Sequence, residues 1–189
     1  MEAGNVDQSL GTQVATDANH QAESSVLAKS QDTSLLGKPL KITIILPTNA
    51  YFMAGIRDFT MTVTKNMTGF SEQWAYRFQS VVDELTNNAI EFGSKAGEDI
   101  TITFISEKNK YIEVYVEDTG TGSSQMKAAD MMQYMEDHKN IDPTTITSIR
   151  GRGLSQIVAN WADKVEFLDN NKGGLTAHVV KNFDPDEQL

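Results

Sequence analysis

The sequence predicts an α+β fold, a two-layer α/β sandwich with helices on one face of a mixed, mostly antiparallel sheet. Two observations support this prediction. Apolar residues alternate in several short segments, as in strands, and recur every three or four positions in longer segments, as in amphipathic helices. The segments also follow the order β-α-α-β-β-loop-α-β-β, in which neighbouring strands are joined as hairpins.

The bulk composition narrows the function classes. The chain has 189 residues, a formal net charge of −10 and no cysteine. The acidic balance argues against a general nucleic-acid binder, and the lack of cysteine excludes disulfides, thiolate zinc sites and a cysteine nucleophile. No apolar run reaches the ~18 residues of a membrane span, and the N-terminus lacks the pattern of a secretory signal. We therefore expect a cytoplasmic protein with no membrane or nucleic-acid partner.

The chain divides into three parts by composition. Residues 1–37 are rich in Gln, Ser, Thr, Ala and Asp, and the first aromatic residue of the chain is Tyr51. Such a segment buries too little apolar surface to offset its ordering entropy, which predicts a disordered N-terminal tail. Residues 38–184 are expected to form one domain, followed by a short C-terminal tail at 185–189.

The first half of the domain contains one strand and two helices. Residues 40–46 are rich in β-branched side chains and end at Pro47, which predicts a strand. Apolar positions at helical spacing predict a helix over 49–68, ended by Gly69. Ser71, followed by Glu72 and Gln73, is typical of a helix start, and the helix that follows is expected to run to about Phe92.

The second half is richer in strands. The expected elements are strands at 100–105 and 112–116, a polar segment at 119–152 with a short helix at 124–137, a helix at 153–162, and strands at 164–169 and 175–182. Asn109-Lys110 is expected to form the turn of the first hairpin, and an Asn-Asn-Lys-Gly-Gly sequence the turn of the second.

Glu84 and Asn88 form the first candidate site. They lie four positions apart, so they share one face of the second helix, near the edge of its buried stripe. An Asn amide oxygen suits Mg²⁺, which takes its other ligands from phosphates and water. A carboxylate one turn away can deprotonate a nucleophile near a γ-phosphate. The alternative is that both are solvated helix residues.

Asp118, Gly120 and Gly122 form the second candidate site. A strand leads directly into the sequence Asp-Thr-Gly-Thr-Gly. The carboxylate can accept a hydrogen bond from an exocyclic amino group such as that of adenine, and the glycines allow close approach to a flat ring. A simple turn at the end of a strand is the alternative.

The third candidate site comprises Arg150, Gly151, Arg152, Gly153 and Leu154. This glycine loop leads into a predicted helix, so its free N–H groups and the helix dipole form a phosphate site. The alternative is an ordinary helix start with glycines at a turn.

In this order, the three segments resemble the nucleotide-binding motifs of the GHKL superfamily over about residues 40–183. Glu84 to Asn88 matches the N box, Asp118-x-Gly120-x-Gly122 the adenine-contacting box, and Gly151-x-Gly153-Leu154 the glycine box at the end of the ATP lid. The resemblance implies a histidine-kinase-like ATPase fold with ATP and Mg²⁺ as cofactors and Asn88 as metal ligand. It also places Thr176 near the adenine.

Within this superfamily the chain is most similar to anti-sigma-factor serine kinases. Glu84 stands at the first position of the N box, where sensor histidine kinases usually have Asn or His, and the only upstream histidine, His20, has no heptad pattern around it. The resemblance implies that Glu84 is catalytic and that the γ-phosphate goes to a Ser or Thr of an anti-sigma-factor antagonist. It also implies binding of a sigma factor and regulation of transcription by partner switching.

Several alternatives remain open at the level of sequence. The chain could be a nucleotide-gated protein-binding module without kinase activity, or a detached histidine-kinase ATPase domain, and a homodimer is compatible with either. Met126, Met131, Met132 and Met135 fall in the expected lid, Thr119 to Arg150. They would either pack a lid helix or form an adaptable contact surface for a partner.

Overall fold

The computed structural model describes residues 38–123, 126–138, 154 and 158–188. The chain divides into two units, Met1–Lys38 and Pro39–Leu189, and the elements discussed below belong to the second. The predicted disorder of residues 1–37 concerns a segment outside the described residues, so it stays a prediction.

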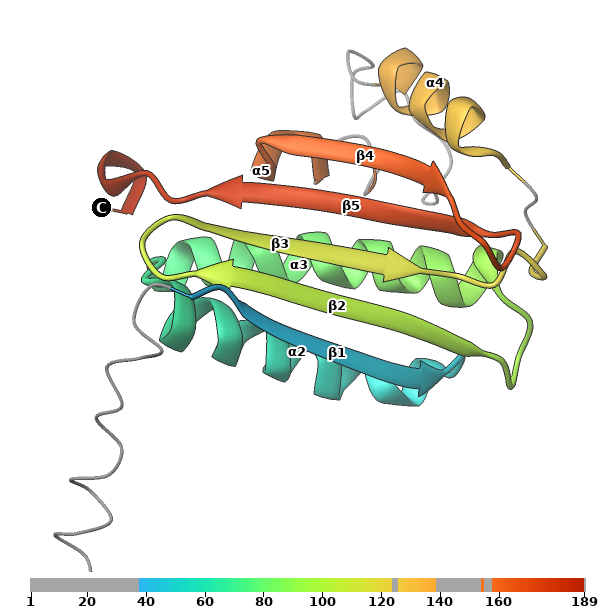
Figure 1. The fold of residues 1–189 in the computed structure, drawn as a ribbon, viewed down its shortest axis with the longest axis horizontal. Coiled ribbons are helices and arrows are strands. Elements are labelled where there is room, and N and C mark those ends of the chain that lie inside the picture. The colour runs from blue at the N-terminus through green and yellow to red at the C-terminus, as the bar shows by residue number, and fades with distance from the viewer. Residues whose placement is uncertain (1–37, 124–125, 139–153, 155–157, 189) are drawn as a thin grey trace, which may run out of the picture. The chain divides into compact units, whose positions relative to one another are not determined.

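Five strands form one sheet in the order β1-β2-β3-β5-β4 (Figure 1). The strands are β1 (Leu40–Pro47), β2 (Asp99–Glu107), β3 (Tyr111–Glu117), β4 (Lys164–Asp169) and β5 (Leu175–Asn182). All four pairings among the described strands are antiparallel, so the predicted mixed sheet is corrected to an antiparallel one. Two of these pairings, β2–β3 and β4–β5, are hairpins, which tight turns make antiparallel, and the non-hairpin pairings β1–β2 and β3–β5 have the same sense.

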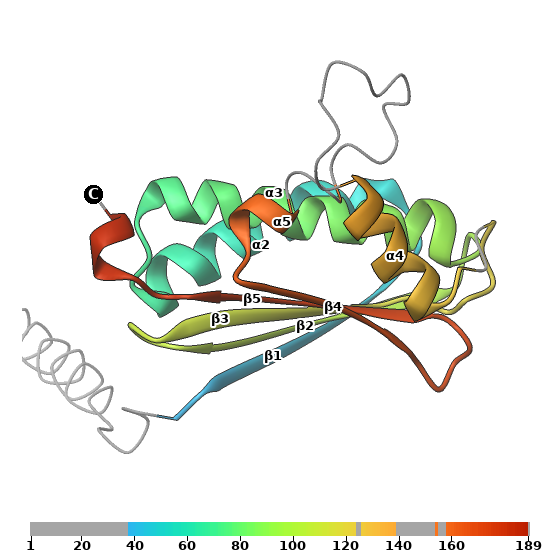
Figure 2. The same ribbon diagram turned by 90° about the horizontal axis from the view of Figure 1, so that it is seen from above.

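The main helices lie on one face of this sheet (Figure 2). They are α2 (Met53–Val63), α3 (Glu72–Asn88), α4 (Ala128–His138) and the short α5 (Ala159–Trp161). A 3₁₀ turn, η2 (Ala50–Phe52), precedes α2, while the π-helical turns η3 (Thr64–Thr68) and η4 (Ala89–Gly93) extend α2 and α3. The predicted α+β sandwich is thus confirmed. Within the described ranges, no helix is both long and apolar enough to cross a membrane.

The hydrophobic core lies between α3 and the central strands. Period-2 alternation turns Ile102 and Phe104 of β2 and Val114 of β3 toward the helices, where each is at most 1% exposed. Phe78, Val81, Val82 and Leu85 of α3 pack against them. Full burial of such side chains stabilises the fold by roughly 1.5–3 kcal/mol each, so α3 is held firmly on the sheet.

The start of α3 is also bonded to the end of the chain. Ser71 caps the helix, and its backbone N–H donates to Gln188 Oε1 at 2.7 Å. The Trp74 indole N–H donates to the Glu187 carbonyl at 2.8 Å. Residues Pro185–Gln188, expected as a tail, therefore form a 3₁₀ turn, η6, that contacts the domain.

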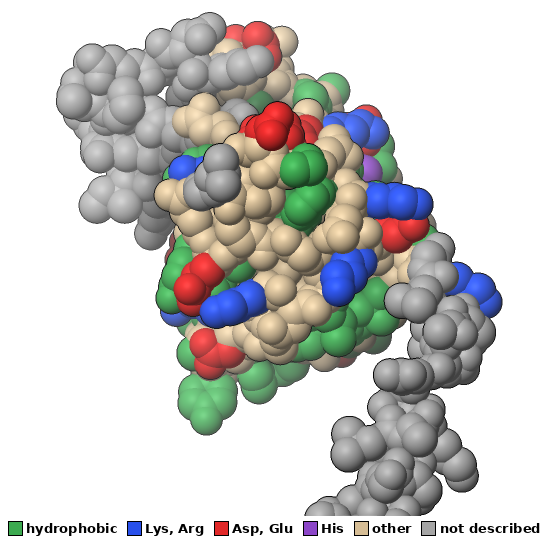
Figure 3. Space-filling model, turned by 90° about the vertical axis from the view of Figure 1, so that its left-hand side faces the viewer, with side chains coloured by type: hydrophobic (Ala, Val, Ile, Leu, Met, Phe, Trp, Pro, Cys, Tyr) green, Lys and Arg blue, Asp and Glu red, His purple; other side chains and the backbone are tan. Residues whose placement is uncertain are grey.

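Charged side chains of both signs are interspersed on the face seen from the left of Figure 1 (Figure 3). The exposed ion pairs of the described residues include Lys65–Glu72 at 2.9 Å, in which both side chains are about half exposed or more. Exposed pairs of this kind contribute about 0–1 kcal/mol each, so the helices depend on the apolar core rather than on surface charge.

Candidate functional site

A cavity of about 260 Å³ lies where the end of α3, the ends of β3 and β5, and α4 meet. Its wall is mostly apolar, with a few polar groups. The lining residues are Leu85, Asn88, Ala89, Phe92, Gly93, Val116, Asp118, Gly120, Met126, Met131, Tyr134, Leu154, Phe167, Gly173, Gly174, Leu175 and Ala177. Pockets for drug-sized ligands measure roughly 300–1,000 Å³, so this cavity suits a flat ring or a nucleoside rather than a whole nucleotide.

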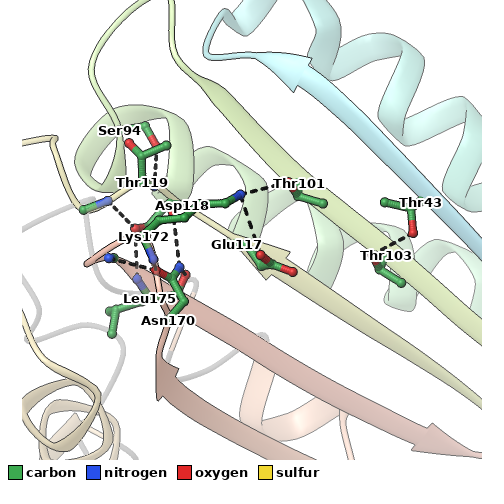
Figure 4. Close-up of polar contacts among 12 residues, drawn as sticks. Thr43, Ser94, Thr101, Thr103, Glu117, Asp118, Thr119, Asn170, Lys172 and Leu175 are labelled. Carbon is green, nitrogen blue, oxygen red and sulfur yellow. Dashed lines mark hydrogen bonds and ion pairs between the residues drawn. The ribbon is translucent and has the colours of Figure 1, made fainter.

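Asp118 is the buried carboxylate of this cavity. It directly follows β3 and is 9% exposed. Its Oδ1 accepts hydrogen bonds from the N–H groups of Gly120 at 2.9 Å and Leu175 at 3.0 Å (Figure 4). Both donors bind the same oxygen, Oδ1. The other oxygen, Oδ2, is therefore the one that can accept a hydrogen bond from a ligand. Burial raises the pKa of Asp118, although the bonds from Leu175 and Gly120 counteract part of that shift.

Two glycines enclose this carboxylate. A Cβ atom on Gly174 would lie 2.1 Å from Asp118 Oδ1, and one on Gly93 would lie 2.5 Å from the Asp118 side chain. Both distances are too short for a side chain, so Asp118 occupies a cradle that only glycine permits. The sequence pattern had identified Gly93 only as a helix stop.

The predicted glycines after Asp118 have different positions. Gly120 lines the cavity and has a φ of +68°, which glycine adopts without strain. Gly122 is not among the lining residues; its N–H donates to the carbonyl of Gly93 at 3.2 Å. Gly120 therefore borders the site, whereas Gly122 ties the loop to the end of η4.

Asn170 holds the Asp118 loop from the β4–β5 turn (Figure 4). Its Nδ2 donates to the carbonyl oxygens of Asp118 at 2.9 Å and Leu175 at 3.0 Å. Its Oδ1 accepts from the N–H groups of Lys172 at 3.0 Å and Gly174 at 2.9 Å. The amide thus uses both donors and both acceptor positions. Sequence reasoning missed this role, because it interpreted Asn170 only as part of a turn.

Glu84 and Asn88 lie at the end of α3. Asn88 lines the cavity, and its Nδ2 donates to Glu84 Oε1 at 3.3 Å. Glu84 lies one turn earlier and is not among the lining residues. Burial is the main cause that raises the pKa of Glu84; the bond from Asn88 lowers it, and the charges of Asp83 and Glu91 raise it further.

The residues fit a magnesium ion only in combination with a ligand. No group of three His, Asp or Glu side chains that could hold a metal was found in the part of the chain that the structure describes. Asn88 donates through its nitrogen to Glu84, which leaves its Oδ1 as a neutral oxygen ligand. Mg²⁺ commonly takes one or two protein oxygens and completes its shell with phosphates and water. Asn88 is suited to that arrangement.

The glycine box is described in part. Arg150, Gly151, Arg152 and Gly153 lie outside the described residues, so their predicted roles stay predictions. Leu154, the last member of the motif, is 4% exposed and lines the cavity. Leu154 therefore brings the end of the glycine box to the same cavity as Asn88 of the first motif and Asp118 of the second.

Thr176 does not reach the cavity. Its neighbours Leu175 and Ala177 both line it, and side chains alternate along a strand, so Thr176 faces the opposite side of β5. His178 lies on that same outer face, where its ring nitrogens are 2.9 Å from Glu113 and 3.2 Å from Glu166. The inner positions at the start of β5, Leu175 and Ala177, are therefore the ones that face the site.

α4 supplies one wall of the cavity. Met131 and Tyr134 of α4 line it, together with Met126 just before the helix, and the Ala128 N–H donates to Asp169 Oδ1 of β4 at 3.1 Å. Met135 is buried, whereas Met132 is 42% exposed. Three of the four lid methionines thus pack against the domain or line the cavity, and Met132 is the exposed one.

Comparison with known families gives one match. The family model of the histidine kinase-like ATPase domain matches residues 46–181, a range that begins in β1, ends in β5 and includes every described lining residue of the cavity. A search of curated proteins found no match.

Proposed function

Because the chain belongs to the histidine kinase-like ATPase domain family, we propose that it is an ATP-binding protein kinase that regulates a partner. Its γ-phosphate acceptor would be a Ser or Thr of an anti-sigma-factor antagonist, as the resemblance to anti-sigma-factor serine kinases implies. A sigma factor would be the second partner, so that phosphorylation regulates transcription by partner switching in the cytoplasm.

The Asp118 carboxylate carries the nucleotide-binding part of the proposal. Two backbone N–H groups hold its Oδ1, and the glycine cradle excludes other side chains from around it. An ionised carboxylate only accepts hydrogen bonds, so Oδ2 is matched to a donor such as the adenine amino group. The apolar remainder of the cavity is matched to the faces of the ring.

Glu84 would supply the base for phosphoryl transfer. The hydroxyl oxygen of the partner attacks the γ-phosphorus, the bond from phosphorus to the bridging oxygen of ADP breaks, and the hydroxyl proton moves to Glu84. The raised pKa of Glu84 favours this role, because a carboxylate with a higher pKa is a stronger base and takes up the proton more readily. Mg²⁺ held through Asn88 Oδ1 would neutralise charge on the phosphates.

A nucleotide-gated binding module is the second candidate. It is supported by α4, which lines the cavity with Met131 and Tyr134 while Met132 on the same helix is exposed. A ligand that changes the position of α4 would then change the surface available to a partner, without transfer of phosphate.

A detached histidine-kinase ATPase domain would give the same pocket but a different acceptor.

Labelled ATP separates these functions. The purified protein is incubated with γ-labelled ATP, Mg²⁺ and the products of neighbouring genes, and the label is located. We expect label on a Ser or Thr of a partner, lost with Glu84→Gln. The matched control is Glu72→Gln, an exposed carboxylate at the other end of α3, which should keep the transfer.

The other outcomes decide against the kinase. Label on a histidine of this chain would overturn the serine-kinase assignment. Partner binding that differs between ATP and ADP, with no label on any protein, would favour the gated binding module.

A further inference from the structure

We propose that Glu98 is a positioning residue that holds the Asp118 loop in its base-binding conformation through Thr119 and Thr121. This inference rests on the proposed nucleotide binding. Glu98 lies in the connection between η4 and β2, outside the motifs that indicated the site and outside the cavity lining.

Three side chains converge at this position. The hydroxyl groups of Thr119 and Thr121 both donate to the same oxygen of Glu98, Oε2. The two hydroxyl oxygens are 2.8 Å apart. One carboxylate oxygen therefore fixes two residues that alternate with Gly120 and Gly122 in the loop.

The neighbouring residues add contacts between the same two segments. The Thr119 N–H donates to Ser94 Oγ at 3.0 Å, and Ser94 is 4% exposed (Figure 4). The Lys95 N–H donates to Thr121 Oγ1 at 3.1 Å. The loop after β3 is thus bonded along its length to the segment after η4.

The segment that carries Glu98 is itself fixed. The Glu98 carbonyl accepts from the Thr48 N–H at 2.8 Å, and the Glu98 N–H donates to the Lys95 carbonyl at 3.2 Å. Thr48 Oγ1 also donates to the Lys95 carbonyl at 2.6 Å. Because Thr48 directly follows β1, the acceptor for the two threonines is attached to the sheet rather than to a free loop.

These contacts bear on Asp118 through Gly120. Gly120 lies between the two threonines and donates to Asp118 Oδ1, so a displacement of Thr119 or Thr121 moves this donor. The hydrogen bonds from Thr119 and then Thr121 lower the pKa of Glu98, which keeps it an ionised acceptor at neutral pH. Asn170 holds the other side of the loop, so Glu98 completes a support on two sides.

Substitution at Glu98 tests the role. With Glu98→Ala we expect the affinities for ATP and for adenosine to fall by the same factor, about three- to ten-fold, because the lost contacts support the base and not the phosphates. Glu98→Gln should restore most of the affinity, since its amide oxygen can still accept from the threonines. Asp99→Ala, the adjacent exposed carboxylate, is the control and should bind as the unchanged protein does.

A double-mutant cycle tests the route. In a Thr119→Val/Thr121→Val background, Glu98→Ala should cause no further loss of affinity. Without nucleotide, the Gly120 amide should exchange its hydrogen faster in Glu98→Ala than in the unchanged protein, while the melting temperature stays within about 3 °C.

Two results would overturn the role of Glu98 without affecting the proposed function. The first is additive losses of affinity in the double-mutant cycle. The second is that Glu98→Ala binds ATP as tightly as the unsubstituted protein. An unchanged protein that binds no nucleotide would instead overturn the proposed function. In that case the amide exchange of Gly120 still reports whether Glu98 holds the loop.

Discussion

Asp118 is buried and Glu84 is partly buried, and both carboxylates have a raised pKa, yet the protein holds them differently. Asp118 receives two backbone N–H bonds and is enclosed by glycines from two other segments. Glu84 receives one side-chain bond, from Asn88 at 3.3 Å, among the described residues. The short Asp118 side chain is thus preorganised by contacts from three segments, whereas Glu84 is held by one side-chain bond within its own helix.

The difference matches two tasks. A group that recognises a base gains affinity from a fixed position, because its ordering entropy is lost during folding rather than during binding. A group that takes up and releases a proton benefits from a pKa near the working pH and from contact with an incoming hydroxyl. The predictions below test whether recognition and transfer are separate in this way.

The largest effect is expected for Asp118→Asn. It replaces an acceptor by an amide that can present a donor to the adenine amino group, so nucleotide affinity should fall about 100-fold. At 100 times its dissociation constant, ATP adds ~2.7 kcal/mol to the stability, and thermal shift should show most of this lost. The control is Glu117→Gln, which should retain the thermal shift. Glu117 contacts Lys172 on the other side of β3. Retention of the shift in Asp118→Asn would show that Asp118 is only a turn residue.

Gly174→Ala should have the next largest effect. The added Cβ would lie 2.1 Å from Asp118 Oδ1, so the carboxylate or the β4–β5 turn has to move. We expect nucleotide affinity to fall about ten-fold, measured by calorimetry. The control is Gly55→Ala, where nothing lies within 4 Å of the new atom. Equal affinity in both variants would contradict a rigid cradle.

Acid should weaken nucleotide binding through Asp118. Only the ionised carboxylate offers Oδ2 purely as an acceptor for the amino group while Oδ1 accepts from Gly120 and Leu175, and burial raises the pKa of Asp118 above 3.8. Affinity should therefore decrease as the pH falls through this raised pKa, by up to about ten-fold per pH unit below it. A titration of affinity against pH checks this, and the residual binding of Asp118→Asn should lack the dependence.

Glu84→Gln should separate stability from transfer. Since the pKa of Glu84 in the folded protein is raised above 4.5, the ionised form costs folding free energy at neutral pH. The stability of the unchanged protein should decrease as pH rises from 4.5 through the raised pKa, and the variant should lack this decrease. Its melting temperature at pH 7 should rise by no more than about 3 °C, with ATP affinity kept and transfer lost.

Asn88→Ala belongs to the same comparison. It should reduce the part of nucleotide affinity that depends on Mg²⁺ and leave the binding of adenosine nearly unchanged. If Glu84→Gln and Asn88→Ala weaken ATP binding equally, the separation of roles is wrong.

The smallest effect is expected from removal of residues 1–37. Their composition predicts that they contribute little apolar burial, so ATP affinity and melting temperature should remain almost unchanged. A large decrease of either value would show that this segment contacts the ATP-binding unit.

Most of the fold could be predicted from local patterns. The strand expected at 175–182 has those bounds in β5, and the helices expected at 49–68 and from Ser71 to Phe92 correspond to α2 and α3 with their flanking turns. Periodicity and turn residues are local signals, and here tertiary packing did not override them. Of the helix expected at 153–162, the structure describes α5, Ala159–Trp161, as regular helix.

The site could be predicted only where a motif is contiguous. Asp118 and Asn88 were found from their neighbours in sequence, and both line the cavity. Asn170 bonds to a residue 52 positions away, and Glu98 to residues 21 and 23 positions away. Such contacts follow from how loops meet in space, and no sequence period reports them. Thr176 shows the opposite case, since the period of two along its strand assigns the inner face to Leu175.

The contact between η6 and the start of α3 has a practical consequence for handling the protein. A purification tag or fluorescent fusion attached after Leu189 would begin beside Gln188, whose side chain bonds to the Ser71 N–H. Fusions are therefore better placed upstream of β1. The same contact provides a built-in optical reporter, because the Trp74 indole that donates to Glu187 should change its emission when η6 detaches.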